Sequence, residues 1–257
     1  MRSPIQVVDC HGHIGTHPDF PAYKICPQEM VQVMDLLNIE SLAITSTLAC
    51  YNDCPRGNEE INEVLKHYPG RFRGYITVNP NPPGEGLDQL QRFAHFHKPP
   101  LIKLHPDLHK YPVNGPNYLP IWDYAHQTHA VVLVHTWDSD PNCGPLLMAP
   151  IARQFPGARI LLGHSGVTWR GYEQSLEVAR NCPNTFLDIS GSQSHRTILE
   201  HCVNRIGDQR VLFGSDMPYL EAAMPLGRVL TARISDESKA AILRHNFLRL
   251  LGRDKSS

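Results

Sequence analysis

The chain opens with the stretch Ile5-Gln6-Val7-Val8-Asp9-Cys10-His11-Gly12-His13, an apolar run that ends in two histidines. Side chains two residues apart in a strand point to the same face, so His11 and His13 are predicted to lie side by side at a strand's carboxyl end. Two neighbouring neutral imidazoles are half of a catalytic zinc site. One His-x-His motif is also compatible with a turn cap and a buried core histidine, so its interpretation depends on the rest of the chain.

Short apolar runs alternate with amphipathic stretches as far as the carboxyl terminus. Eight strands are predicted at residues 5–10, 41–47, 72–78, 101–105, 131–136, 159–164, 185–190 and 210–216. Helices are predicted at 27–37, 58–68, 86–97, 118–129, 144–155, 168–181, 193–206 and 236–251, the last with Asp236 as N-cap and Gly252 as its stop. This alternation is typical of an α/β protein with a single, distorted (β/α)8 TIM barrel over residues 1–257 and a C-terminal helix. An open doubly wound sheet is disfavoured because the first strand–helix turn lacks a G-x-G-x-x-G loop.

Composition limits the partners and the compartment. The formal net charge is −1, so no global field attracts nucleic acid or anionic lipid. No apolar run approaches the roughly 18 residues that span a bilayer, and the first strand begins too early for a signal peptide. The seven cysteines are odd in number and scattered, and no second pair completes a zinc knuckle with Cys50 and Cys54. We expect a cytoplasmic protein with no nucleic-acid or membrane partner, for which a homodimer stays open.

Metal-ligand and acid–base residue types end most of the predicted strands. They are His11, His13, Lys103, His105, His135, His164 and Asp216. Barrel enzymes place catalytic groups at these carboxyl ends. Three imidazoles and a carboxylate can hold a divalent metal, which lowers the pKa of a bound water toward about 7, and an unligated histidine or carboxylate can take that water's proton. Asp216 could also cap the next segment, with Pro218 in its first turn.

The ordered motifs resemble a known family over nearly the whole chain. They are DCHGHIG (9–15), LIKLHP (101–106), VVLVHT (131–136), ILLGHSG (160–166), FLDISGS (186–192), RVLFGSDMP (210–218) and ILRHNFLRLLG (242–252). This set is similar to the amidohydrolase superfamily, in particular to the branch that contains aminocarboxymuconate-semialdehyde decarboxylase. The branch includes metal-dependent TIM-barrel hydrolases, decarboxylases and hydratases.

The resemblance implies a site and a cofactor. It implies that His11, His13, His135 and Asp216 bind a divalent metal, zinc first and manganese as the alternative, and that His164, with Asp216, is catalytic. Two roles are open for Lys103. The favoured one is that Lys103 binds a substrate carboxylate beside a single metal ion. The alternative is that Lys103 is carboxylated and bridges two metal ions.

Loop residues are predicted to set specificity. The candidates for substrate binding are Arg56, His105 and Trp137 beside Lys103, with Trp169 and Arg170 as a further wall and cation. We expect a metal-dependent hydrolase that acts on an amide, a lactone or a related bond of a small anionic substrate. A non-oxidative decarboxylase or hydratase at the same site is the alternative. A metal-dependent nuclease is disfavoured, because it would need a basic groove and the net charge is −1. A non-enzymatic barrel with a vestigial site is also disfavoured, because it would have lost a metal ligand and none of the expected set is missing.

Overall fold

Nine short strands run parallel in residues 3–20, 26–51 and 53–252, the part of the chain that the computed structural model describes. They are β1 (Val7–Ile14), β2 (Ile39–Ser46), β3 (Phe72–Gly74), β4 (Ile76–Thr77), β5 (Leu101–Leu104), β6 (Val131–His135), β7 (Arg159–Gly163), β8 (Thr185–Asp188) and β9 (Val211–Leu212). All eight predicted strands are therefore present, and one of them is split.

The split lies at Tyr75, inside the strand predicted at 72–78. The Tyr75 side chain is fully buried, and its hydroxyl donates a hydrogen bond to the carbonyl oxygen of Cys10 at 2.8 Å. Its backbone N–H donates to the carbonyl oxygen of Ile44 at 2.9 Å. Tyr75 thus links the ladder β1-β2-β3 to the ladder that runs from β4 to β9.

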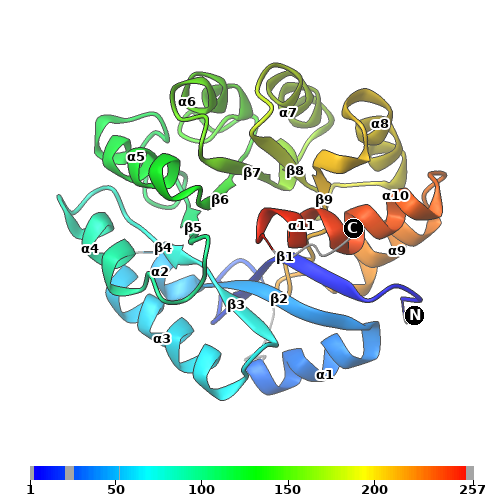
Figure 1. Ribbon diagram of the computed structural model, residues 1–257, viewed down its shortest axis with the longest axis horizontal. Helices are drawn as coiled ribbons and strands as arrows, with labels where there is room; N and C mark the ends of the chain where they lie inside the picture. The colour runs from blue at the N-terminus through cyan, green and yellow to red at the C-terminus, as the bar shows by residue number, and fades with distance from the viewer. Residues whose placement is uncertain (1–2, 21–25, 52, 253–257) are drawn as a thin grey trace.

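The other ends of the two ladders meet beside β1. Gly12 forms a parallel bridge with Met217, the N–H of Cys10 donates to the carbonyl of Phe213 at 3.0 Å, and that of His13 donates to the carbonyl of Met217 at 2.7 Å. These bonds hold the segment after β9 against β1. The strands consequently form the ring of a (β/α)8 barrel (Figure 1).

Helices surround this ring (Figure 1). They are α1 (Pro27–Leu37), α2 (Thr47–Tyr51), α3 (Cys54–His67), α4 (Glu85–Arg92), α5 (Leu119–Thr128), α6 (Met148–Gln154), α7 (Trp169–Asn181), α8 (Arg196–Ile206), α9 (Ala223–Thr231), α10 (Asp236–Ala240) and α11 (Asn246–Leu250). Short 3-10 turns are η1 (Pro116–Tyr118), η2 (Pro145–Leu147), η3 (His164–Gly166) and η4 (Asp208–Arg210). Helices α2 and α9 were not predicted.

The predicted C-terminal helix is divided into α10, a π-helical turn η5 (Ala241–His245) and α11. The carbonyl oxygen of Ile242 in η5 accepts a hydrogen bond from the N–H of Phe213 at 3.1 Å, which ties the turn to the end of β9. The N-cap prediction was wrong by one residue. Ser235 is the cap, because its side chain accepts from the N–H of Ser238 at 3.1 Å.

Helix α11 closes the amino end of the barrel. Phe247, Leu250 and Leu251 belong to the same buried cluster as Leu101 and Val131, the first residues of β5 and β6. Apolar side chains therefore fill the barrel interior at that end. The carboxyl ends of the strands are left for polar groups.

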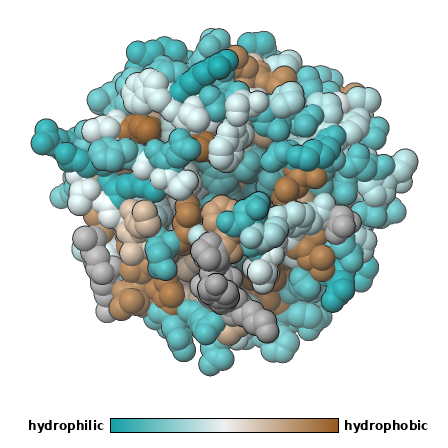
Figure 2. Space-filling model, turned by 180° about the vertical axis from the view of Figure 1, so that it is seen from behind, coloured by the Kyte–Doolittle hydropathy of each residue, from teal (hydrophilic) through white to brown (hydrophobic). Residues whose placement is uncertain are grey.

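Figure 2 shows the face of the molecule opposite to the one that α11 covers in Figure 1. Hydrophilic residues occupy most of this face, and hydrophobic residues form separate patches on it. Across the described ranges, every helix is too short or too polar to cross a bilayer.

Candidate functional site

Six side chains from five strands converge at the carboxyl end of the barrel. They are His11 and His13 on β1, Lys103 on β5, His135 at the end of β6, His164 directly after β7, and Asp216 in the segment that follows β9. His13, Lys103, His164 and Asp216 are buried and line a cavity of about 340 Å³, and His135 lines it as a less buried residue. His11 is fully buried behind the lining. The parallel strands bring together residues more than two hundred positions apart in the sequence, such as His11 and Asp216, as is expected for a barrel.

Three possible metal donors form one group, from His11, His164 and Asp216. One nitrogen or oxygen of each lies within 4.8 Å of those of the other two, which is near enough for a single ion to bridge. Oδ1 of Asp216 is also 3.0 Å from Nε2 of His13 and 3.7 Å from Nε2 of His11. His11, His13 and Asp216 thus lie together as the sequence predicts.

His135 lies farther along the cavity wall. Its ring stacks on His105, with centroids 4.2 Å apart and planes 12° apart, and its centroid is 5.1 Å from that of His164. The predicted ligand set contains His135, whereas the group within reach of one ion contains His164.

Burial controls the charge of these groups. It lowers the pKa of His135 to about 3 and that of His164 to about 4, and it lowers the pKa values of His11 and His13 well below the usual range. These imidazoles are therefore neutral at pH 7 and present nitrogen lone pairs. Burial also raises the pKa of Asp216.

Lys103 is the fully buried cation of the site. Its Nζ is 3.2 Å from Nε2 of His11, and burial lowers its pKa. A lysine at this place can reach both a bound anion and the His11–Asp216 group. The position of Lys103 is therefore compatible with both roles, the binding of a substrate carboxylate and the bridging of two metal ions.

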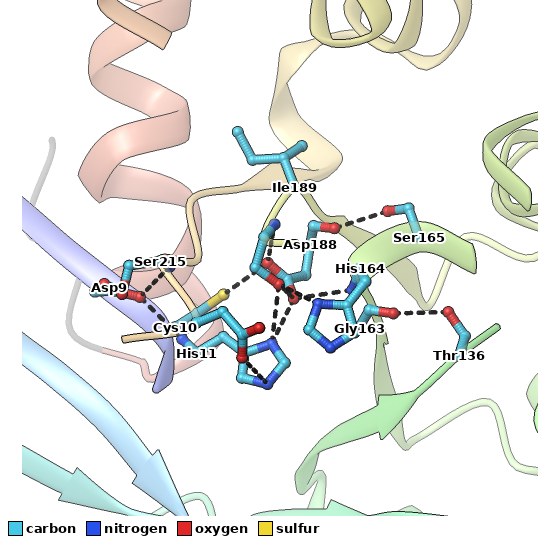
Figure 3. Close-up of polar contacts among 12 residues, drawn as sticks. Asp9, Cys10, His11, Thr136, Gly163, His164, Ser165, Asp188, Ile189 and Ser215 are labelled. Atoms are coloured by element: carbon cyan, nitrogen blue, oxygen red, sulfur yellow. Dashed lines mark hydrogen bonds and ion pairs between the residues drawn. The ribbon is translucent and has the colours of Figure 1, made fainter. Parts of the chain in front are cut away.

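Two functional residues had no role in the sequence prediction, although both lie in the motif FLDISGS. Asp188, the last residue of β8, accepts a hydrogen bond from Nδ1 of His11 at 2.7 Å (Figure 3). Ser190 Oγ lies 2.8 Å from Nδ1 of His164. The available signal was their position. Asp188 ends a strand, as His135 does, and Ser190 follows it by two residues.

The turn η3 projects His164 into the cavity in an unusual backbone conformation. His164 and Ser165 have φ angles of 59° and 48°, and Gly166 follows with 79°. The turn is held by Ser165 Oγ, which donates to the carbonyl of Asp188 at 2.9 Å (Figure 3). It is also held by Thr136 Oγ1, which accepts from the N–H of Gly166 at 2.8 Å. Left-handed backbone at non-glycine residues is strained and occurs at functional sites where the surroundings enforce it.

Aromatic rings form two walls of the cavity. Tyr219 stacks on His13 at 4.5 Å and on Phe20 at 5.1 Å between centroids. Trp137 lies 6.4 Å from His135. These rings give the cavity flat apolar surfaces next to the histidines.

The loop predictions have mixed outcomes. Trp137 and His105 line the cavity, whereas Arg56 and Arg170 are exposed and lie outside the lining that the described residues form. Asp53 caps α3 through the N–H of Arg56, so that arginine starts a surface helix. Trp169 is 55% exposed and packs against His201 at 5.0 Å, away from the cavity wall. The structure therefore gives no geometric basis for a clamp at Arg56 or a wall at Trp169.

Comparison with solved structures agrees with the barrel. The chain is similar to 2,6-dihydroxybenzoate decarboxylase from Rhizobium, with a TM-score of 0.78 and 16% identity over 99% of this chain and 100% of that one. It is similar to 5-carboxyvanillate decarboxylase from Sphingomonas paucimobilis, with a TM-score of 0.75 and 17% identity over 96% and 99%. A third similar structure is dihydroxybenzoic acid decarboxylase from Polaromonas, with bound manganese and the inhibitor 2-nitroresorcinol (TM-score 0.76, 16% identity, 98% of each chain).

At these identities the likeness concerns the fold. The family follows from a different comparison, in which the sequence model described as Amidohydrolase matches residues 8–253. That range contains every site residue named above, and it is nearly the whole chain. The protein therefore belongs to the amidohydrolase family of enzymes.

Proposed function

We propose that the protein is a metal-dependent enzyme that removes the carboxyl group of a small, flat carboxylic acid without an oxidant. The observation that carries this proposal is the buried cation Lys103 beside the His11–Asp216 group, at a cavity with aromatic walls. The volume of about 340 Å³ is at the lower end of small-molecule sites. The decarboxylases of similar fold act on compounds of this size and charge, according to their names.

The residues present fit a divalent metal. Nδ1 of His13 is buried and has no hydrogen-bond partner in the described part of the chain, and the neighbouring imidazoles are neutral. Nitrogen donors with one carboxylate suit zinc or manganese. We assign His11, His13 and Asp216, which lie together, to hold it, with His135 from the neighbouring wall as the fourth ligand that the family resemblance implies. When bound, the ion supplies positive charge that polarises a substrate oxygen.

The chain's own residues provide binding and proton transfer. The ammonium of Lys103 binds the substrate carboxylate through a charge-assisted hydrogen bond. The walls formed by Tyr219 and Trp137 hold the flat substrate and exclude water.

Decarboxylation breaks the bond between the carboxyl carbon and the substrate, and the electron pair stays on the substrate carbon. That carbon takes a proton while carbon dioxide leaves. We assign the proton to Nε2 of His164, because the negative charge of a bound carboxylate raises the pKa of that imidazole from about 4. Nδ1 of the same ring is already engaged with Ser190.

Hydrolysis of an amide or lactone is the second candidate. The observation that favours it is the neutral state of His164, since a buried imidazole with a free Nε2 can accept a proton from water. The same residues would then act as base in place of acid. The product distinguishes the two reactions.

The test combines metal content with product analysis. The protein is expressed with zinc or with manganese and measured by elemental analysis, and each form is incubated with hydroxybenzoates, carboxylated lactones and amides. We expect about one metal per chain, release of carbon dioxide, and deuterium on the former carboxyl-bearing carbon in heavy water. Treatment with a chelator should abolish turnover, and the ion should restore it. Ring-opened acids without carbon dioxide would establish hydrolysis, and a metal-free active protein would exclude both assignments.

The seven cysteines are all unpaired, which suits a reducing compartment such as the cytoplasm. This supports the expected location of the enzyme. It also means that the fold depends on packing and hydrogen bonds, without disulfides.

A further inference from the structure

The buried carboxylate of Asp188 accepts hydrogen bonds from His11 and from the segment that carries His164. Oδ2 of Asp188 lies 2.7 Å from Nδ1 of His11 and 3.2 Å from the backbone nitrogen of His164 (Figure 3). The same oxygen lies 2.5 Å from Oγ of Ser190. Oδ1 accepts from the N–H of Ser190 at 2.9 Å. Asp188 has no exposed surface, so these donors replace the water that the carboxylate would otherwise bind.

Ser190 connects this carboxylate to the second imidazole. Its Oγ lies 2.8 Å from Nδ1 of His164 and 3.1 Å from Nδ1 of His11. A serine hydroxyl has one hydrogen and two acceptor lone pairs. The hydrogen is assigned to the contact with Asp188, which is the shortest one and has a charged acceptor.

This assignment fixes where the protons of both rings lie. With its own hydrogen directed at Asp188, Ser190 can only accept from His164, so Nδ1 of His164 carries a proton. Nδ1 of His11 carries one as well, since it faces the carboxylate. The opposite nitrogen of His11 lies 3.2 Å from the Lys103 ammonium, which can only donate and therefore needs an unprotonated Nε2.

We propose that Asp188 and Ser190 are positioning residues that hold His11 and His164 in the same tautomer, with Nδ1 protonated and both Nε2 lone pairs available to the cavity. The inference rests on the proposed function, in which His11 holds the metal and His164 moves a proton. It adds that one carboxylate sets the state of both rings. Asp188 acts on His11 directly and on His164 through the Ser190 hydroxyl.

The direct branch concerns metal binding. A ligating histidine whose other nitrogen donates to a carboxylate is a stronger ligand in a fixed orientation, and loss of such a partner typically weakens metal binding by about 10–100-fold. We expect Asp188→Asn to weaken zinc binding by about that factor. The asparagine amide cannot replace the carboxylate in either orientation, because its NH2 group would face the backbone N–H of Ser190 or that of His164.

The indirect branch concerns proton transfer. Ser190→Ala removes the link to His164 and leaves the contact between His11 and Asp188 intact. We expect zinc affinity within about threefold of the wild type and a kcat lowered by about 10–100-fold, with little change in KM. Ser190→Thr retains a hydroxyl and should recover most of the loss.

The tautomers can be read directly by nitrogen NMR of the metal-free protein labelled with ¹⁵N-histidine. The signals of His11 and His164 are identified by their absence from the His11→Ala and His164→Asn proteins. We expect both rings to show a protonated Nδ1 and an unprotonated Nε2 in the wild type. His11 should keep this pattern in Ser190→Ala, and His164 should lose it.

Thr185→Val is the matched control. It removes a buried hydroxyl from the other end of β8, where Oγ1 donates to the carbonyl of Cys182 at 2.7 Å. Zinc affinity and both histidine spectra should stay as in the wild type. A change equal to that of Asp188→Asn would show a general effect of damage to β8 and would overturn the proposal.

The two proposals fail in different ways. An Nε2-protonated ring at His11 or His164 in the wild type overturns the inference, whatever the enzyme's reaction is. Wild-type zinc affinity in Asp188→Asn does so too, and the NMR of Ser190→Ala decides the matter if Asp188→Asn does not fold. A wild-type protein that binds neither zinc nor manganese refutes the proposed function, and the spectra still test the tautomers.

Discussion

Gly171, in the first turn of α7, lies against the turn that carries His164. A Cβ atom built on Gly171 would lie 2.0 Å from the carbonyl oxygen and 2.4 Å from the carbonyl carbon of Gly166. Both atoms are backbone, so no side chain can rotate away. To reach an ordinary contact of 3.4 Å, α7 and η3 would have to separate by about 1.4 Å. Gly171→Ala is therefore predicted to displace the catalytic turn.

The magnitude has two parts. Overpacking of this kind costs about 1–3 kcal/mol, and the better helix propensity of alanine returns about 0.5–1 kcal/mol. A net loss of about 1–2 kcal/mol lowers the melting temperature by roughly 2–8 °C for a chain of this size. A shift of about 1 Å in a catalytic group can cost on the order of 100-fold in rate, so turnover should fall much more than stability.

The assay compares thermal unfolding, metal content and kcat in Gly171→Ala and Gly227→Ala. Gly227 lies inside α9, and a Cβ atom there would meet nothing within 4 Å. Its replacement should stabilise the protein by about 0.5–1 kcal/mol and leave turnover unchanged. If Gly171→Ala behaved like Gly227→Ala in both stability and kcat, the close contact would not hold the turn and the reasoning would be refuted.

Three further substitutions test the site and the barrel. Lys103→Met should keep the metal and raise KM for a carboxylated substrate by roughly 10–150-fold, because a lost charge-assisted hydrogen bond costs about 1.5–3 kcal/mol. Loss of the metal on this substitution would indicate a carboxylated lysine. His164→Asn should lower kcat by about 10²–10⁴-fold with the metal retained, whereas His11→Ala should lose metal and activity together; loss of metal from His164→Asn would make that histidine a ligand. Phe247→Ala should destabilise the protein by about 3–5 kcal/mol in urea unfolding without changing kcat below its melting range, because α11 lies at the amino end; a changed kcat would contradict that separation.

The sequence predicts the barrel well because periodic apolar runs report on burial. Strands such as Val131–His135 are buried on both faces, and their continuous apolar pattern is visible without any tertiary information. The split at Tyr75 was not predictable in this way. It depends on one aromatic side chain that reaches across the barrel to Cys10, and an apolar run contains no sign of that contact.

The candidate site shows the same limit at a finer scale. Residues that end strands, such as His11 and Asp216, can be placed at one edge of the barrel from the strand pattern alone. The loop residues Arg56 and Trp169 could not be placed from the strand pattern, because the direction of a loop depends on its own caps and contacts. Asp53 directs Arg56 into the start of α3, and His201 holds Trp169 on the surface.

Asp188 is the most informative omission, because it satisfied the same rule as the residues that were predicted. It is a polar residue at the end of a strand, but a carboxylate that faces histidines is as readily a ligand as a partner of ligands. Only the 2.7 Å contact with Nδ1 of His11 separates the two roles, because that contact occupies the nitrogen on the far side of the ring. Hydrogen-bond direction, and not residue type, therefore distinguishes the groups that we assign to the metal from those that we assign to orient them.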